Sequence, residues 1–101
     1  MEEWKELKNS KTPFIILKQS NTCLFSSKAK ERVMTIIDQI PYDVYEVMVQ
    51  ENPEAAKDIK ETFEIRSLLS QLIVVENGEP VMHLNHRYIQ PDAILEFFDK
   101  K

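Results

Sequence analysis

The chain has 101 residues, of which 43% are hydrophobic and 30% charged, and its formal net charge is −4. This size and composition predict a single soluble domain spanning residues 1–101, and the acidic balance argues against binding to nucleic acid or to an anionic membrane surface. No apolar run approaches the roughly 20 residues that span a bilayer. A single cysteine cannot form an internal disulfide, and the N-terminus does not have the pattern of a secretory signal, so a reducing cytoplasmic location is expected.

The first half of the chain predicts a short helix, a buried strand and a long helix. Within residues 2–8, two apolar residues lie three positions apart, on one face of a helix. The run 14–17 is wholly apolar with two β-branched isoleucines, which is typical of a strand buried on both faces. From about residue 23 to residue 39, apolar residues recur every three or four positions, the pattern of an amphipathic helix that Pro41 ends. These residues are Phe25, Ala29, Val33, Ile36 and Ile40.

The second half predicts a strand, a helix, a hairpin and a last helix. Residues 42–49 are rich in β-branched and aromatic types, which favours a strand. Asn52 followed by proline is typical of a helix start, with Asn52 as the N-cap. The apolar run within 71–76 predicts a buried strand, and the Asn-Gly pair after it predicts a tight turn into an antiparallel strand. Pro91 begins the final helix.

This order of elements predicts an α/β fold. A strand, a crossover helix and a second strand form a right-handed parallel unit, and the hairpin adds an antiparallel pair. A mixed four-stranded sheet flanked by helices on both faces would cover every apolar stripe. That is the thioredoxin-like architecture, although other α/β arrangements fit the same order.

Cys23 lies just after the first buried strand, where the long helix is predicted to begin. Helix N-termini carry unpaired N–H groups and a positive dipole end, which favour the thiolate over the thiol. Lys18 and Lys28 are candidates to add to that effect, and Ser26 lies one turn along with a hydroxyl that could reach the sulfur. The residues around Cys23 are polar, whereas a buried structural cysteine more often has apolar neighbours. Because the thiolate is the nucleophile in disulfide exchange, we predict a redox role.

The sequence also bears on which ligand the cysteine could take and on whether a metal site or a hydrolase site is present. Residues 8–30 contain five lysines and no acid, which suits a carboxylate-bearing small thiol, although for any single lysine a solvated surface position is the default. A metal site is not indicated, because there is one cysteine and because His83 and His86 would lie on opposite faces of a strand. A hydrolase is not indicated either, since no glycine-rich nucleophile elbow is present.

The stretch "SNTCLFSSKA" resembles the cysteine motif of the YtxJ-type monothiol bacilliredoxins, small thioredoxin-fold proteins of bacteria that use bacillithiol. The resemblance runs from about residue 3 to residue 98. Further along, "NGEPVMHLNHRYI" is similar to a family segment with a hairpin glycine and a histidine, here Gly78 and His86. The positions that match within the cysteine motif are Ser20, Thr22, Cys23, Ser26, Ser27 and Ala29.

The resemblance implies that the Cys23 thiolate removes bacillithiol, or a similar small thiol, from mixed disulfides on S-thiolated client proteins. Ser26 stands where a dithiol enzyme has its second cysteine, so a second small thiol or a partner must release the adduct. Thr22, Lys28 and His86 are predicted to contribute to substrate binding. The small thiol would be a co-substrate, no tightly bound cofactor is expected, and we expect a monomer or a weak dimer.

Two positions depart from the family pattern. Leu24 replaces the proline expected after the cysteine. Ser70 occupies the place of a cis proline that presents a backbone edge to the substrate, and Gln71 matches the residue after it, so both are predicted substrate-binding residues. A non-proline cis bond costs about 2.5–4 kcal/mol, and we therefore expect a trans bond at Leu69–Ser70. The departures leave two alternatives open: a thioredoxin-fold binding module, and a redox sensor without efficient turnover.

Overall fold

The computed structural model describes residues 2–20, 24–64, 70–85 and 88–100, which form a four-stranded sheet and its helices. Within these ranges, none of the helices has the length and hydrophobicity needed to cross a lipid bilayer. The strands are β1 (Phe14–Gln19), β2 (Asp43–Met48), β3 (Gln71–Glu76) and β4 (Glu79–Asn85). The helices are α1 (Glu2–Lys8), α2 (Leu24–Thr35), α3 (Pro53–Phe63) and α4 (Pro91–Asp99), with a short 3₁₀ helix, η1 (Ile37–Gln39), after α2.

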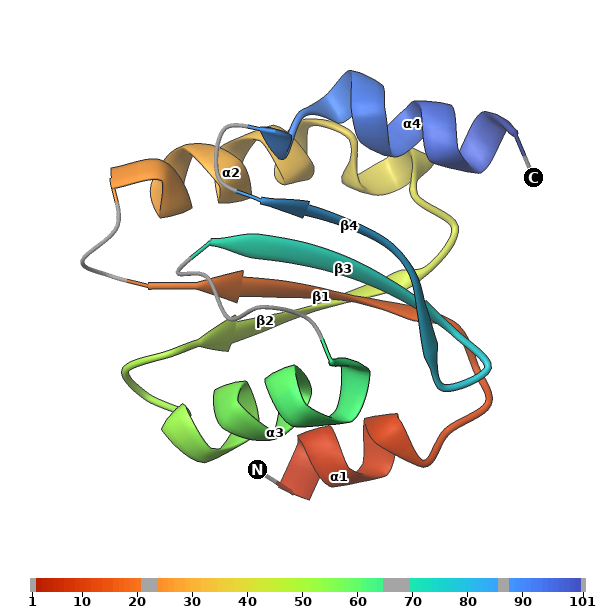
Figure 1. Ribbon diagram of the computed structural model, residues 1–101. Helices are drawn as coiled ribbons and strands as arrows, with labels where there is room; N and C mark the ends of the chain where they lie inside the picture. Colours follow the sequence, from red (N-terminus) through yellow and green to blue (C-terminus); the bar gives the residue numbers. More distant parts are fainter. Residues whose placement is uncertain (1, 21–23, 65–69, 86–87, 101) are drawn as a thin grey trace.

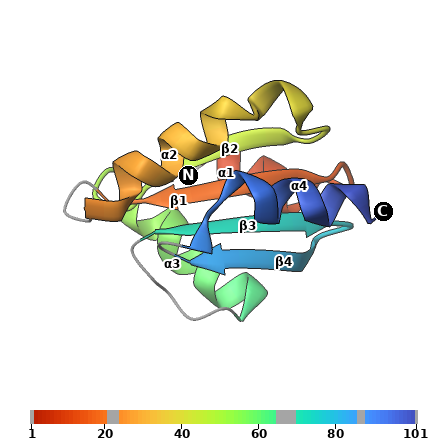
Figure 2. The same cartoon turned by 90° about the horizontal axis from the view of Figure 1, so that it is seen from above.

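The sheet is mixed and has the strand order β2-β1-β3-β4. Strands β1 and β2 are parallel, whereas β3 runs antiparallel to both β1 and β4. Figure 1 shows α2 and α4 on one face of the sheet and α1 and α3 on the other. Figure 2 shows the four strands side by side in this order. The predicted mixed sheet with helices on both faces is therefore confirmed.

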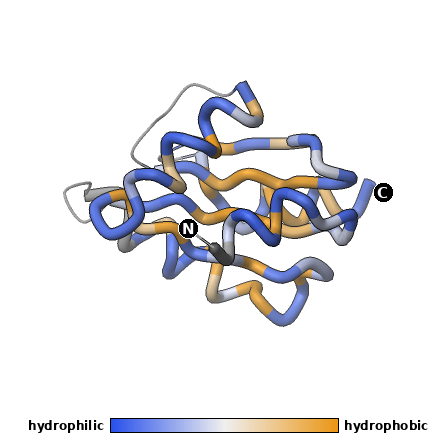
Figure 3. Tube along the Cα trace, turned by 90° about the horizontal axis from the view of Figure 1, so that it is seen from below, coloured by the Kyte–Doolittle hydropathy of each residue, from blue (hydrophilic) through white to orange (hydrophobic). Residues whose placement is uncertain are grey.

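The sheet separates two clusters of buried apolar side chains. Because successive residues of a strand point to opposite faces, Ile15 and Leu17 join the cluster beneath α2 and α4, while Phe14 and Ile16 join the cluster beneath α1 and α3. All four side chains are at most 3% exposed, as predicted for a strand buried on both faces. In Figure 3 the most hydrophobic stretches of the chain are accordingly those of the sheet.

The apolar stripes predicted for the helices face these two clusters. Helix α2 contributes its stripe to the first cluster, and the side chain of Phe25, which was also predicted, lies outside the described part of the structure. Helix α3 contributes to the second cluster and α4 to the first. The buried members of the stripes are Ala29, Val33, Ile36 and Ile40 after β1, Ala56, Ile59 and Phe63 in α3, and Ile94 in α4.

One helix end differs from the prediction, and one predicted helix start is confirmed. Helix α2 does not continue to residue 39: Ile36, at φ −122° and ψ 14°, leaves helical geometry, and the chain tightens into η1. The Thr35 hydroxyl bonds back to the carbonyl three residues earlier, at 2.6 Å. Asn52 is the N-cap of α3, and Pro53 is the first residue of the helix, as predicted. The Asn52 carbonyl accepts the first hydrogen bond of the helix, from the Ala56 N–H at 3.0 Å, although the Asn52 side chain makes no capping hydrogen bond among the described residues.

Because the chain has a single glycine, residues other than glycine occupy some of its left-handed (positive φ) backbone positions. Asn77 (φ 54°) and Gly78 (φ 76°) form the turn of the β3–β4 hairpin, and a positive φ at both positions is what a tight two-residue turn requires. This part of the prediction is confirmed. Helix α3 also ends in a left-handed residue, Glu64 at φ 54°, where glycine is the usual choice.

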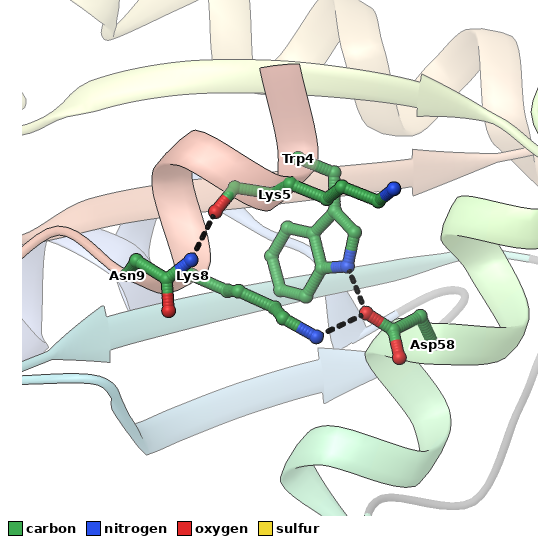
Figure 4. A network of polar contacts seen from close by, with 5 residues as sticks. All are labelled: Trp4, Lys5, Lys8, Asn9 and Asp58. Atoms are coloured by element: carbon green, nitrogen blue, oxygen red, sulfur yellow. Dashed lines mark hydrogen bonds and ion pairs between the residues drawn. The ribbon is translucent and has the colours of Figure 1, made fainter. Parts of the chain in front are cut away.

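Helix α1 is fastened to α3 by polar contacts on Asp58. The Trp4 indole N–H donates to Asp58 Oδ2 at 2.6 Å, and the Lys8 ammonium lies 2.8 Å from the same oxygen (Figure 4). The hydrogen bond from Lys8, followed by that from Trp4, holds the pKa of the Asp58 carboxyl below its ordinary value of 3.8. The carboxylate form therefore stabilises the docking of α1.

Asp58→Asn is expected to lower the free energy of unfolding by about 1 kcal/mol at pH 7, because the variant loses the ion pair and weakens the bond to the indole. A carboxyl whose pKa is lower in the folded state contributes stability above its unfolded pKa and loses that contribution as the pH falls through the folded pKa. The difference from wild type should therefore be smaller at pH 3 than at pH 7, as measured by urea denaturation followed by circular dichroism. Glu31→Gln, on the exposed face of α2, is the control. Equal losses at both pH values would contradict the role of the charge.

Candidate functional site

The predicted site lies at the end of the sheet from which α2 begins. Strands β1 and β2 both finish there, and the antiparallel β3 starts there. Helix α2 begins at Leu24, and Cys23 immediately precedes that residue in the chain. The carboxyl ends of strands and a helix N-terminus therefore meet at this edge, which is where α/β sheets commonly bind ligands.

The structure describes some of the predicted site residues and not others. Thr22, Cys23 and His86 lie outside the described residues, and so does the Leu69–Ser70 bond. Their roles remain predictions.

The remaining predicted residues are placed by α2 and β3. Ser26 is the third residue of α2, although its side chain lies outside the described part of the structure. Lys28 follows two residues later with an exposed side chain. Ser70 and Gln71 stand at the start of β3, at 0% and 2% exposure. The fold thus brings the start of α2 and the start of β3 to one end of the sheet.

On the face of the sheet covered by α2, a carboxylate ties three elements together. Glu46 of β2 accepts a hydrogen bond from Gln19 Nε2 of β1 at 2.6 Å. The same oxygen, Oε2, lies 3.0 Å from the Lys30 ammonium of α2. These contacts fix the end of β1 relative to the second turn of α2. Sequence reasoning missed Glu46, although an acidic residue between the apolar and aromatic residues Tyr45 and Val47 was an available signal.

Ser20, the residue after β1, is anchored in the same way. It is fully buried, and its hydroxyl oxygen accepts a hydrogen bond from Gln50 Nε2 at 2.6 Å. Ser20 matches the family motif, and the structure gives that match a structural reason. The serine ties the end of β1 to the segment after β2, three residues before Cys23 in the chain.

On the opposite face, a polar row crosses three strands. Lys18 Nζ lies 3.4 Å from Gln71 Oε1, and Gln71 Nε2 donates to Asn85 Oδ1 at 3.2 Å. Lys18 is only 1% exposed, so the default expectation of a solvated lysine is wrong at this position. Burial, and after it the nearby charge of Lys60, lowers the pKa of Lys18 below its ordinary value of 10.5.

The basic stretch of the sequence does not form one basic surface. Lys8 pairs with Asp58 through α1, and Lys30 pairs with Glu46 through α2. These two helices lie on opposite faces of the sheet (Figure 1). Strand β1 connects the two helices, so lysines that are close in sequence lie on opposite faces of the folded sheet.

Ser70 has an unusual environment. Its Oγ is buried and has no hydrogen-bond partner among the described residues. Buried hydroxyls are nearly always satisfied, and an unsatisfied one costs about 1–3 kcal/mol. The orphan hydroxyl stands where the family resemblance places the substrate-facing proline.

Solved structures establish the fold class. A structure described as having a thioredoxin fold matches with a TM-score of 0.84 and 20% identity, over 95% of this chain and 86% of that chain. Mitochondrial thioredoxin 3 from Saccharomyces cerevisiae matches with a TM-score of 0.73 and 15% identity, over 99% and 89% of the two chains. Trxlp from Edwardsiella tarda matches with a TM-score of 0.70 and 21% identity, over 95% and 90%.

A family match over residues 1–94, on a thioredoxin fold, places the chain in the class of thiol-disulfide oxidoreductases. The family model "Monothiol bacilliredoxin BrxC" matches residues 1–94. The chain therefore belongs to the monothiol bacilliredoxin family, as the resemblance of its cysteine motif implied.

Proposed function

We propose that the protein removes bacillithiol, or a similar small thiol, from mixed disulfides on client proteins, with Cys23 as the nucleophile. The Cys23 thiolate attacks the sulfur of the small thiol, the client's disulfide bond breaks, and the client leaves as a thiolate that takes up a proton. A second small thiol then attacks the adduct on Cys23. The Cys23 thiolate is released together with a disulfide of the two small thiols, so no external oxidant is consumed.

The observation that carries this proposal is the family match over residues 1–94, which includes the chain's single cysteine. The start of α2 one residue after Cys23 supports the chemistry, because the unpaired N–H groups of a helix N-terminus favour a thiolate. Ser26, the third residue of α2, cannot act as a resolving thiol. Transfer followed by release to a second thiol is then the reaction open to the protein.

The proposed substrate contacts come from both sides of the site. We include Ser70 in the proposed set because its buried hydroxyl has no hydrogen-bond partner among the described residues, and Gln71 because it holds the start of β3 in place through Lys18 and Asn85. Thr22, Lys28 and His86 complete the proposed set. In this proposal the small thiol acts as a co-substrate in the cytoplasm, and no cofactor is bound permanently.

A transfer assay tests the proposal. Mixed with a bacillithiolated client protein, the wild type is expected to acquire bacillithiol on Cys23 while the client loses it, as followed by intact-mass spectrometry. Cys23→Ala should leave the client's adduct in place. Clients carrying cysteine or coenzyme A instead of bacillithiol show which small thiol is preferred. If the wild type leaves all three adducts untouched, the proposed function is wrong.

The serine at position 70 favours one alternative, because it replaces a proline that presents the substrate-docking edge in the family. In that alternative the protein binds or senses thiols without efficient turnover. It would accept one equivalent of bacillithiol on Cys23 and keep it in the presence of excess bacillithiol. Repeated cycles of uptake and release would contradict the alternative.

A further inference from the structure

The two outer strands of the sheet, β2 and β4 (Figure 2), differ in how their free edges are protected. Strand β4 contains Pro80, and its register with β3 shifts between Val74 and Val75. A proline and a bulge both hinder the pairing of a further strand. Strand β2 has neither, since its six residues contain no proline and pair with β1 in unbroken register. Among the described residues β2 pairs with β1 alone, so its outer edge keeps backbone groups that another strand can bond.

The apolar side chains of β2 are half-buried, whereas the whole of β1 is buried. Val44 packs against the cluster beneath α2 and α4. Tyr45 and Val47 pack against the cluster beneath α1 and α3. Beside its open edge, β2 therefore exposes apolar surface on both faces of the sheet.

A hollow lies beside β2 on each face of the sheet. On the side of α1 and α3 there is a pocket of about 80 Å³, whose walls include Trp4 and Val47. On the side of α2 there is a wider hollow of about 430 Å³, whose walls include Ile37 and Val44. Because successive side chains of a strand point to opposite faces, a strand added along β2 would direct its side chains alternately into the two hollows.

Exposed acids lie at both ends of β2. Asp43 begins the strand, and Glu51 and Glu54 follow its end. None of the three forms an ion pair within the ranges that the structure describes. Glu51 and Glu54 border a hollow that shares Asn52 and Ala55 with the pocket beside Trp4. These carboxylates oppose the pairing of two copies of the chain through β2 and attract a basic segment.

We propose that the outer edge of β2 binds an extended segment of a partner protein, with apolar residues at its centre and lysine or arginine at both ends. The segment adds a strand to the sheet through backbone hydrogen bonds. Its central side chains occupy the two hollows, and its cations lie near Asp43 at one end and near Glu51 and Glu54 at the other. The interaction needs neither a thiol nor a disulfide, so it goes beyond the proposed function.

The test uses the fluorescein-labelled peptide acetyl-KKVIVIVKK-amide, whose binding is followed by fluorescence anisotropy. We expect saturable binding with a Kd below about 1 mM and slower amide hydrogen exchange in β2 but not in β4. Two control peptides should not bind at the same concentrations. In KKVIPIVKK the central proline hinders strand pairing, and EEVIVIVEE carries the opposite charge. The peptides contain no cysteine, so the result is independent of the transfer assay.

Charge reversal at the edge gives the matched comparison. Asp43→Lys is expected to weaken binding of the basic peptide about threefold to tenfold. Glu79→Lys makes the same change on the protected strand β4 and should alter the Kd less than twofold. Glu51→Lys, in the turn after β2, should also weaken binding and keeps the test decisive if Asp43→Lys does not fold.

Three results would overturn the inference. The first is equal binding of the proline peptide, and the second is an affinity that Asp43→Lys and Glu51→Lys leave unchanged. The third is a dimer of the chain by sedimentation, with slow exchange in β2 before any peptide is added, because a second copy would then be the occupant of this edge.

Discussion

Trp4→Ala is expected to lower the free energy of unfolding by about 3–5 kcal/mol, the usual range for a buried aromatic residue replaced by alanine. Trp4 is 3% exposed and stands edge-on to Phe63, with the ring centroids 5.7 Å apart. Helix α1 has only seven residues, too few to be stable by itself in water. Its docking therefore depends on the contacts of Trp4 with α3, and the substitution removes most of them.

Guanidinium denaturation followed by circular dichroism measures this loss, because Trp4 is the chain's single tryptophan and its replacement removes the fluorescence signal. Trp4→Phe is the matched control. It keeps an aromatic ring against Phe63 and loses the N–H donor to Asp58, so a smaller cost of about 1–2 kcal/mol is expected. An alanine variant within 1 kcal/mol of wild type would show that α1 contributes little to the fold.

Ile16→Ala is expected to lower the free energy of unfolding by about 2–5 kcal/mol. Ile16 is fully buried in the middle of β1, between Tyr45 of β2 and Ile73 of β3. It also lines a small pocket of about 80 Å³ beside Trp4. The lost methyl groups would enlarge that pocket, and the close-packed sheet cannot collapse to fill it.

Two further substitutions calibrate the measurement. Ile16→Val removes one methylene group and keeps the β-branch, so about 0.5–1.5 kcal/mol is expected. Met34→Ala, at a side chain that is 53% exposed on α2, should change stability by less than about 0.5 kcal/mol. If Met34→Ala lowered the free energy of unfolding as much as Ile16→Ala, burial would not determine the size of these stability losses.

The elements of the fold were predictable because their signals are local. The apolar run of β1, the three- and four-residue spacing in α2 and the Asn77–Gly78 pair each report a conformation that neighbouring residues determine. The early end of α2 and the lack of a side-chain capping bond from Asn52 were not predictable in the same way. Both depend on backbone angles at single residues, which tertiary packing sets.

The site was predictable only in part. The position of Cys23 before a helix follows from neighbouring residues, and α2 does begin at Leu24. The burial of Lys18 could not be predicted, because its partner Gln71 is 53 residues away in the chain. The hydrogen bond from Gln19 to Glu46 likewise joins two strands that a crossover helix separates in the chain. Contacts of this kind appear only when the strand order and register are known.

The separation of the interior into two apolar clusters by the sheet has a consequence for how the protein can change over time. Helix α2 follows Cys23 and packs on one face, whereas the Trp4 contacts lie on the other. Substitutions in α2 can therefore change its side of the protein while α1 and α3 keep their packing. Natural variation, and directed evolution in the laboratory, could draw on the Trp4 side as a reserve of thermodynamic stability while the residues of α2 change.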